Sequence, residues 1–175
     1  MKFIYTKEKA LSEAQCQKII NLMDSSKLMP APSKFANYRV MSVEAHLQEW
    51  TPILYEALEE YKQIHPFLEK ACAWRLDSLC NYQKYSPNKY YGAEHCEHGP
   101  YKEDARRILA WTIYLNTIKK EGGTRFPQQK FTAPARAGDL LIWPASWTYS
   151  HHGINAPEET KYIITGWCCY LKAVR

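Results

Sequence analysis

The nine residues from Arg107 to Leu115, RILAWTIYL, contain the alternation that decides the fold. In an extended strand, successive side chains point to opposite faces of the sheet. The bulky apolar side chains share one face: Leu109, Trp111, Ile113 and Leu115. The smaller and partly polar side chains share the other: Ile108, Ala110, Thr112 and Tyr114. We expect the bulky face to pack under helices and the smaller face to line a cavity, with the Tyr114 hydroxyl pointing inward.

The chain after residue 73 repeats this pattern of short apolar or alternating segments, which are separated by Pro, Gly, Asn and charged residues. The expected strands are residues 76–85, 93–98, 107–115, 124–126, 130–133, 139–143, 147–153 and 161–171. Short strands at this spacing indicate a sandwich or a barrel.

The first part of the chain predicts two amphipathic helices. Ser12 is the expected N-cap of the first helix. Thr51 is the expected N-cap of the second, and Pro52 suits its first turn. The second helix should end at His65-Pro66. Helices first and strands later favour the α+β class. We therefore expect one mainly β domain over residues 1–175, in which residues 1–73 form a helical support layer and residues 74–173 form the β core.

The composition excludes several classes of protein. The formal net charge of +5 is spread along the sequence, which predicts no nucleic-acid-binding tract. No apolar run is long enough to span a bilayer, so no membrane segment is expected. The six cysteines form no C-x-x-C pair, which argues against a structural zinc site and predicts free thiols in a reducing cytoplasm.

Two histidines and one glutamate form the candidate metal site. His95 and Glu97 are separated by one residue, so an extended backbone would point both side chains the same way. His151 lies in a late apolar region. Two imidazoles and one carboxylate leave open positions on an octahedral ion, as in non-haem Fe(II) oxygenases. The alternatives are a surface His-x-Glu pair and a hydrogen-bonded core histidine.

Lys161 begins the apolar run Lys161–Trp167 and is the candidate anchor for an anion. A lysine that faces into a barrel is costly unless an anion pairs with it. The alternative is a lysine at the edge of a strand that faces water.

Several short motifs follow one another between Asn81 and Tyr170. They are Tyr85-Ser-Pro-Asn, His95-Cys-Glu97, Ile113-Tyr114-Leu115-Asn116, Gly122-Gly123-Thr124-Arg125-Phe126, Pro134-Ala-Arg-Ala-Gly138-Asp139, Ile142-Trp143-Pro144, His151 and Lys161. In this order they resemble the Fe(II)- and 2-oxoglutarate-dependent dioxygenases of the prolyl 4-hydroxylase-like group, which includes short phage and bacterial members. The resemblance implies a double-stranded β-helix, or jelly-roll barrel.

The resemblance also implies roles for individual residues. His95, Glu97 and His151 would hold Fe(II), and Lys161 would pair with the far carboxylate of 2-oxoglutarate. The other expected members of the cosubstrate pocket are Tyr114, Tyr85, Thr124, Thr165 and Trp167, although the two threonines and Trp167 also suit ordinary strand and core positions. O2 would be the second cosubstrate, and ascorbate is a further candidate.

Two features depart from the family pattern. Most relatives carry aspartate where this chain has Glu97, so the longer carboxylate must retract or bind with altered geometry. His152 follows His151 directly, and a strand that points His151 inward would point His152 outward. We therefore expect His151 to be the ligand.

The implied activity is hydroxylation of a C–H bond with release of succinate and CO2, and a prolyl residue in a peptide or protein is the expected substrate. A free amino acid or another small molecule is the alternative substrate. A zinc hydrolase and a non-catalytic barrel that binds a small acid are the alternative classes. The expected location is the cytoplasm, or the host cytoplasm if a phage encodes the chain.

Overall fold

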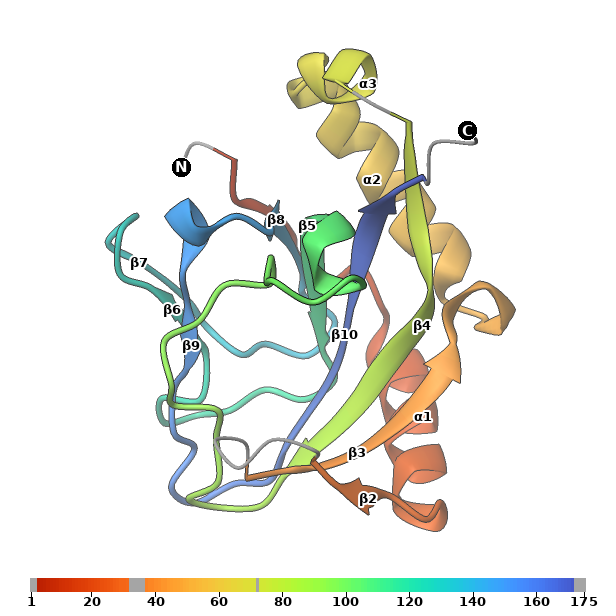
Figure 1. Ribbon diagram of the computed structural model, residues 1–175. Helices are drawn as coiled ribbons and strands as arrows, with labels where there is room; N and C mark the ends of the chain where they lie inside the picture. Colours follow the sequence, from red (N-terminus) through yellow and green to blue (C-terminus); the bar gives the residue numbers. More distant parts are fainter. Residues whose placement is uncertain (1–2, 32–36, 72, 172–175) are drawn as a thin grey trace.

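The computed structural model describes residues 3–31, 37–71 and 73–171, and it contains two antiparallel sheets that lie opposite one another (Figure 1). The main sheet has the strand order β1-β8-β5-β10-β4-β3-β2. Its strands are β1 (Tyr5–Lys7), β2 (Met29–Pro30), β3 (Arg39–Glu44), β4 (Trp74–Tyr85), β5 (Arg107–Tyr114), β8 (Leu140–Pro144) and β10 (Lys161–Tyr170). The smaller sheet, in the order β7-β6-β9, contains β6 (Thr124–Phe126), β7 (Phe131–Ala133) and β9 (His152–Gly153).

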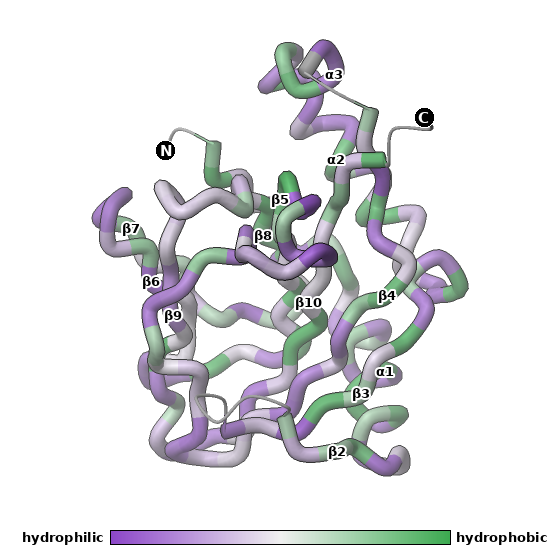
Figure 2. Tube along the Cα trace, in the orientation of Figure 1, coloured by the Kyte–Doolittle hydropathy of each residue, from purple (hydrophilic) through white to green (hydrophobic). Residues whose placement is uncertain are grey.

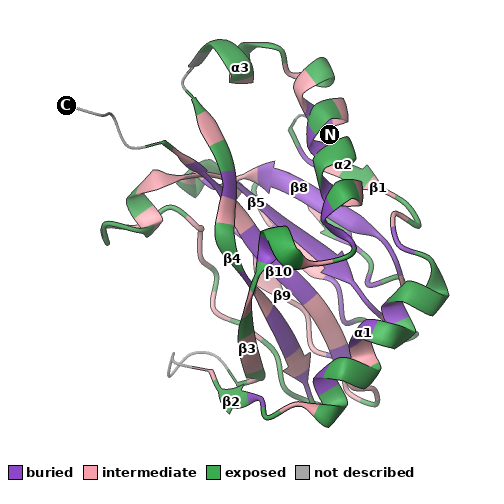
Figure 3. Ribbon diagram, turned by 90° about the vertical axis from the view of Figure 1, so that its right-hand side faces the viewer, coloured by how far each residue is buried: buried purple, intermediate pink, exposed green. Residues whose placement is uncertain are grey.

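Helices cover one face of the main sheet (Figure 3). They are α1 (Glu13–Ser25) and α2 (Thr51–Ile64), followed by the short α3 (Phe67–Ala71). Three 3-10 turns, η1 (Ala45–Leu47), η2 (Asp104–Arg106) and η3 (Trp147–Tyr149), lie in the connections. Apolar residues run along the strands at the centre of the main sheet (Figure 2), so the helices and the sheet enclose the larger core. The mainly β, α+β fold class is therefore as predicted.

Strand β5 separates the larger core from the site, as its sequence predicts. All four residues of the bulky face are buried in the core beneath the helices: Leu109, Trp111, Ile113 and Leu115. On the other face, Ala110 and Tyr114 belong to a second apolar cluster, and Thr112 and Tyr114 line a cavity.

The prediction that Ile108 faces the cavity is wrong. Ile108 packs against the larger core. The pairing of β10 with β5 shifts at this point, since Cys168 lies opposite Leu109 whereas Cys169 lies opposite Arg107. A bulge of this kind adds a residue to one strand and reverses the alternation beyond it. As a result, Arg107 lines the cavity.

The two helices begin close to the predicted residues. Ser12 caps α1 through a capping box, in which its hydroxyl accepts from the Gln15 N–H and the Gln15 side chain accepts from the Ser12 N–H. The N-cap of α2 is Trp50 rather than Thr51, because the Thr51 hydroxyl donates to the Ala45 carbonyl and does not cap the helix. This helix ends at Ile64 with His65 as its C-cap, at the predicted boundary before Pro66.

Two of the predicted strands are wrong. Residues 93–98 form a loop, because the N–H groups of both Glu97 and His98 donate to the carbonyl of Ala145, which an extended strand does not allow. Residues 147–153 contain the turn η3 and only the two-residue strand β9. Residues before 73 also supply β1, β2 and β3 to the main sheet, in addition to the two long helices.

The cysteines within the described segments are free thiols: Cys16, Cys80, Cys96, Cys168 and Cys169. Within the same segments, no helix combines the length and apolar character needed to cross a membrane.

The capping box predicts the effect of one substitution on stability. Replacing Ser12 with Ala should lower the free energy of unfolding by about 1 kcal/mol, because an N–H of the first turn loses its acceptor. Urea denaturation would measure this difference. Ser25→Ala, at the other end of α1, is the control and should change it by less than about 0.5 kcal/mol. Equal effects of the two substitutions would contradict the role of the capping box.

Candidate metal centre

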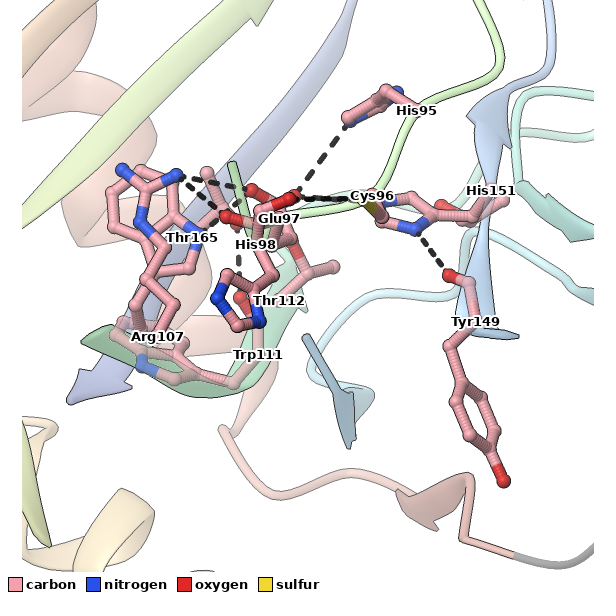
Figure 4. A network of polar contacts seen from close by, with 12 residues as sticks. His95, Cys96, Glu97, His98, Arg107, Trp111, Thr112, Tyr149, His151 and Thr165 are labelled. Carbon is pink, nitrogen blue, oxygen red and sulfur yellow. Dashed lines mark hydrogen bonds and ion pairs between the residues drawn. The ribbon is translucent and has the colours of Figure 1, made fainter. Parts of the chain in front are cut away.

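Two loops bring His95, Glu97 and His151 together. His95 and Glu97 follow β4, and His151 directly precedes β9. The N–H of His95 donates to the His151 carbonyl at 3.0 Å, and the N–H of His151 donates to the His95 carbonyl at 2.8 Å. This isolated bridge holds the two histidines side by side. One ligand atom from each of the three residues lies within 4.8 Å of the others (Figure 4).

The hydrogen bonds of the two imidazoles define which nitrogen is available to a metal. The Nδ1 atom of His95 lies 3.0 Å from the Ala93 carbonyl, and that of His151 lies 3.0 Å from the Tyr149 carbonyl. A carbonyl only accepts, so each Nδ1 carries a proton, and Nε2 is the nitrogen that can bind a metal once it releases its own proton. Both Nε2 atoms face Oε1 of Glu97, at 3.7 Å from His95 and 3.3 Å from His151.

The charge of Glu97 is stabilised by its two neighbours. Burial would raise the pKa of Glu97, but the hydrogen bonds and charges of His151 and His95 outweigh it and hold the pKa well below its usual range. Burial would conversely lower the pKa of His95, and Glu97 raises it overall. The cluster therefore presents an ionised carboxylate and two imidazoles, a donor set that suits Fe(II).

A cavity of about 320 Å³ adjoins the cluster and opens onto the inner face of the main sheet. Alternate residues of β10 line it: Lys161, Ile163, Thr165 and Trp167. Neighbouring strands add Asn81, Gln83 and Tyr85 from β4, and Thr112 and Tyr114 from β5. The three candidate ligands line the same cavity. Its volume lies at the lower end of the range for small-molecule sites.

Lys161 is a buried cation in this cavity. Only 4% of its surface is exposed, and burial lowers its pKa from 10.5 to about 8. Its Nζ donates to the Ile154 carbonyl at 3.3 Å and lies 4.9 Å from the centre of the Tyr85 ring. Among the described residues, no carboxylate forms an ion pair with it. The predicted alternative of a lysine that faces water therefore does not hold.

The other predicted pocket residues have defined contacts. The hydroxyls of Tyr114 and Thr124 lie 2.7 Å apart, which joins β5 to the smaller sheet. The Tyr85 hydroxyl donates to Gln83 at 2.7 Å. The Thr165 hydroxyl donates to the Trp111 carbonyl at 2.9 Å, so its proton is used within the main sheet. All four of these hydroxyl-bearing residues line the cavity, as predicted.

Trp167 does more than line the cavity, which the sequence did not indicate. Its Nε1 donates to Oε2 of Glu97 at 2.8 Å. The structure also adds Arg107, whose guanidinium stacks on the Trp167 ring with its Cζ 3.7 Å from the ring centre. Strict alternation along β5 placed Arg107 on the opposite face, and only the bulge at Ile108 could have corrected that expectation.

Comparison with known protein families identifies the family of this chain. Residues 80–169, more than half of the chain, match the family model described as the 2OG-Fe(II) oxygenase superfamily. No curated protein sequence matches the chain. The chain therefore belongs to the 2OG-Fe(II) oxygenase superfamily and is a 2-oxoglutarate-dependent dioxygenase that uses Fe(II), 2-oxoglutarate and O2.

Solved structures with the same fold cover nearly all of the chain. The viral collagen prolyl hydroxylase of Paramecium bursaria Chlorella virus-1, as its 2OG complex, aligns with a TM-score of 0.76 and 18% identity over 97% of each chain. A Pseudomonas putida prolyl-4-hydroxylase aligns with a TM-score of 0.73 and 17% identity, over 97% of this chain and 93% of that one.

A third structure is a Trichoplax adhaerens prolyl hydroxylase in complex with a peptide fragment of hypoxia inducible factor. It aligns with a TM-score of 0.67 and 12% identity, over 97% of this chain and 84% of that one. Together with the family match, these similarities confirm the predicted double-stranded β-helix, or jelly-roll, fold.

The converging side chains predict a single metal site that depends on Glu97 and His151. Calorimetric titration with Mn(II), a redox-stable substitute for Fe(II), should show one site in the unaltered protein. That site should be lost in Glu97→Ala and in His151→Ala, because each change removes a donor atom. His152→Ala is the matched control, since His152 lies outside the cluster. Loss of the site in the control, or its retention in Glu97→Ala, would contradict the assignment.

Proposed function

We propose that this dioxygenase hydroxylates a C–H bond of a prolyl residue in a peptide or protein, with release of succinate and CO2. The observation that carries the proposal is that one cavity contains both the converging ligands and a buried lysine that has no carboxylate partner within the described segments. The proposed catalytic unit is the whole chain, residues 1–175, as a single domain. In support, β1 and β3 belong to the same sheet as β4, β5, β8 and β10.

In this proposal, His95, Glu97 and His151 hold Fe(II). Their donor set fits the ion, and three protein ligands leave three positions open on an octahedral metal. The bound iron would supply the activation of O2 and the oxidation of 2-oxoglutarate and substrate. The protein's own contribution at this end of the cavity is to hold the two Nε2 atoms and Oε1 in fixed positions, through the backbone acceptors at Ala93 and Tyr149.

Lys161 is the proposed partner of the far carboxylate of 2-oxoglutarate. A dianionic cosubstrate would supply the counter-charge that this buried ammonium lacks, and a buried pair of this kind is strong when both partners are present. The hydroxyls of Tyr114 and Thr124 are the proposed additional donors, and Thr165, Tyr85 and Trp167 form the walls. Burial of the pocket excludes water and strengthens these interactions.

The prolyl substrate is proposed from the neighbouring folds. One aligned structure is a collagen prolyl hydroxylase, and another is a prolyl hydroxylase in complex with a peptide fragment. The aromatic residues Tyr38 and Tyr91, which line the cavity, suit contact with a prolyl ring.

The pKa of Lys161 predicts how cosubstrate affinity varies with pH. Because burial lowers that pKa to about 8, the ammonium is intact at pH 7 and is mostly neutral at pH 9. Affinity for 2-oxoglutarate should be constant below pH 8 and fall as the pH rises through it, by about tenfold between pH 7 and pH 9. Calorimetric titration of the Mn(II)-loaded protein would measure this change.

The matched variant for this titration is Lys161→Arg, because a guanidinium remains protonated throughout the range. Its affinity can be weaker at every pH, but it should not fall between pH 7 and pH 9. If the unaltered protein shows no fall, or the arginine variant shows the same fall, Lys161 does not bind the carboxylate.

Turnover tests the proposed reaction directly. The protein with Fe(II), 2-oxoglutarate and O2 should form succinate faster when proline-containing peptides are added, and mass spectrometry should find one added oxygen on a prolyl residue. Peptides with alanine in place of proline are the control. Stimulation by both peptides would contradict the prolyl substrate. Stimulation by a free amino acid alone would favour the small-molecule alternative.

A further inference from the structure

We propose that Trp167 and Arg107 position Glu97 so that only one of its carboxylate oxygens binds the metal. This inference rests on the proposed function, because it takes Glu97 as a ligand. A glutamate has one more methylene than an aspartate and one more rotatable bond to immobilise. Its carboxylate therefore needs external support to remain in one place, and the two residues supply that support from neighbouring strands.

The two oxygens of Glu97 have different partners. Oε1 faces the Nε2 atoms of both histidines, at 3.3 Å and 3.7 Å. Oε2 instead accepts the hydrogen bond from Trp167 Nε1 at 2.8 Å. A carboxylate whose second oxygen is engaged in this way presents a single donor atom to the imidazole side.

Arg107 supports the same carboxylate from a second direction. Its Nη1 donates to the backbone carbonyl of Glu97 at 3.2 Å and lies 3.6 Å from Oε2. Its Nη2 lies 3.0 Å from a carboxylate oxygen of Asp104. The guanidinium also stacks on the Trp167 ring. Arg107 thus contacts both Glu97 and the residue that holds Glu97.

Strand geometry places these two side chains in the cavity. The bulge at Ile108 directs Arg107 to the cavity side of β5, as bulges near active sites redirect side chains. Trp167 reaches the cavity by regular alternation along β10, on the same face as Lys161 and Thr165. The two strands thereby present a guanidinium and an indole N–H to one carboxylate.

Restricting Glu97 to one oxygen has a consequence for the reaction. A glutamate that bound through both oxygens would take a fourth position on an octahedral ion. Only two coordination positions would then remain on the metal. A cosubstrate that binds through two oxygens and O2 together need three. The contacts of Oε2 therefore preserve the capacity of the site for both cosubstrates. They also stabilise the buried negative charge, because each hydrogen bond to an ionised group is stronger than a neutral one.

The test is a double-mutant cycle on metal affinity, which requires no turnover. The four proteins are the unaltered chain, Trp167→Phe, Glu97→Asp and the double variant, each titrated with Mn(II). Trp167→Phe removes the N–H but keeps a ring for Arg107. It should weaken Mn(II) binding about tenfold, as other losses of a hydrogen bond to a metal ligand do. In the Glu97→Asp background it should change affinity by less than about threefold, because the shorter side chain does not span from the imidazoles to the indole.

The visible spectrum of the Co(II)-loaded protein is a second measurement, since it reports the ligands of the metal. Trp167→Phe frees Oε2 and should change this spectrum. Trp111→Phe is the control, because the Trp111 N–H is buried with no hydrogen-bond partner among the described residues and its ring packs in the core beneath the helices. It should change neither the Co(II) spectrum nor the affinity for Mn(II).

The outcomes separate this inference from the proposed function. If Mn(II) binds and Glu97→Ala abolishes binding, but Trp167→Phe changes neither affinity nor spectrum, the positioning role is wrong and the metal centre stands. If Trp167→Phe weakens binding equally in the glutamate and aspartate backgrounds, its effect is structural and the positioning role is also wrong. If the unaltered protein binds no Mn(II), the proposed metal centre fails and this inference fails with it.

Discussion

The site depends on the alternation of side chains along β10, a strand that separates an apolar core from a polar cavity. Ile164 and Cys168 belong to the apolar core beneath the helices. The residues between and beside them, Lys161, Thr165 and Trp167, face the cavity. A shift of one residue in the pairing of β10 would bury polar groups in the core and turn apolar ones to the site. The pairing of β10 with both β4 and β5 prevents this shift, so the same hydrogen bonds that stabilise the fold also position the site.

The two ends of the cavity carry buried charges of opposite sign. At one end, a buried carboxylate is surrounded by donors: two imidazoles, an indole and a guanidinium. At the other end, a buried ammonium has a carbonyl and a ring face as its neighbours. Buried charges without partners are costly, and the cost at Lys161 shows as its lowered pKa. A metal cation at one end and a dicarboxylate at the other would complement both charges. Fe(II) and 2-oxoglutarate, which this superfamily uses, are such a pair.

Regular elements of this chain could be predicted from the sequence, and irregular ones could not. The capped helix after Ser12, the two faces of β5 and the inward-facing Lys161 follow from periodicity and from simple burial costs. The loop at residues 93–98 could not be predicted, because its shape comes from two N–H groups, those of Glu97 and His98, that share the carbonyl of the distant Ala145. Arg107 was missed for a related reason. A bulge is a property of two paired strands, and neither strand alone contains a signal for it. The convergence of His95, Glu97 and His151 was predicted from a wrong local structure, since a loop and an isolated bridge rather than a strand bring them together.

The central claim is that one cavity binds iron and 2-oxoglutarate together. The most direct measurement is the visible absorption spectrum of the protein without oxygen, recorded with Fe(II), then with 2-oxoglutarate added. We expect a weak charge-transfer band that requires both additions, is absent in Glu97→Ala and needs more 2-oxoglutarate in Lys161→Ala. If iron is bound and saturating 2-oxoglutarate produces no band, iron and 2-oxoglutarate do not share the cavity.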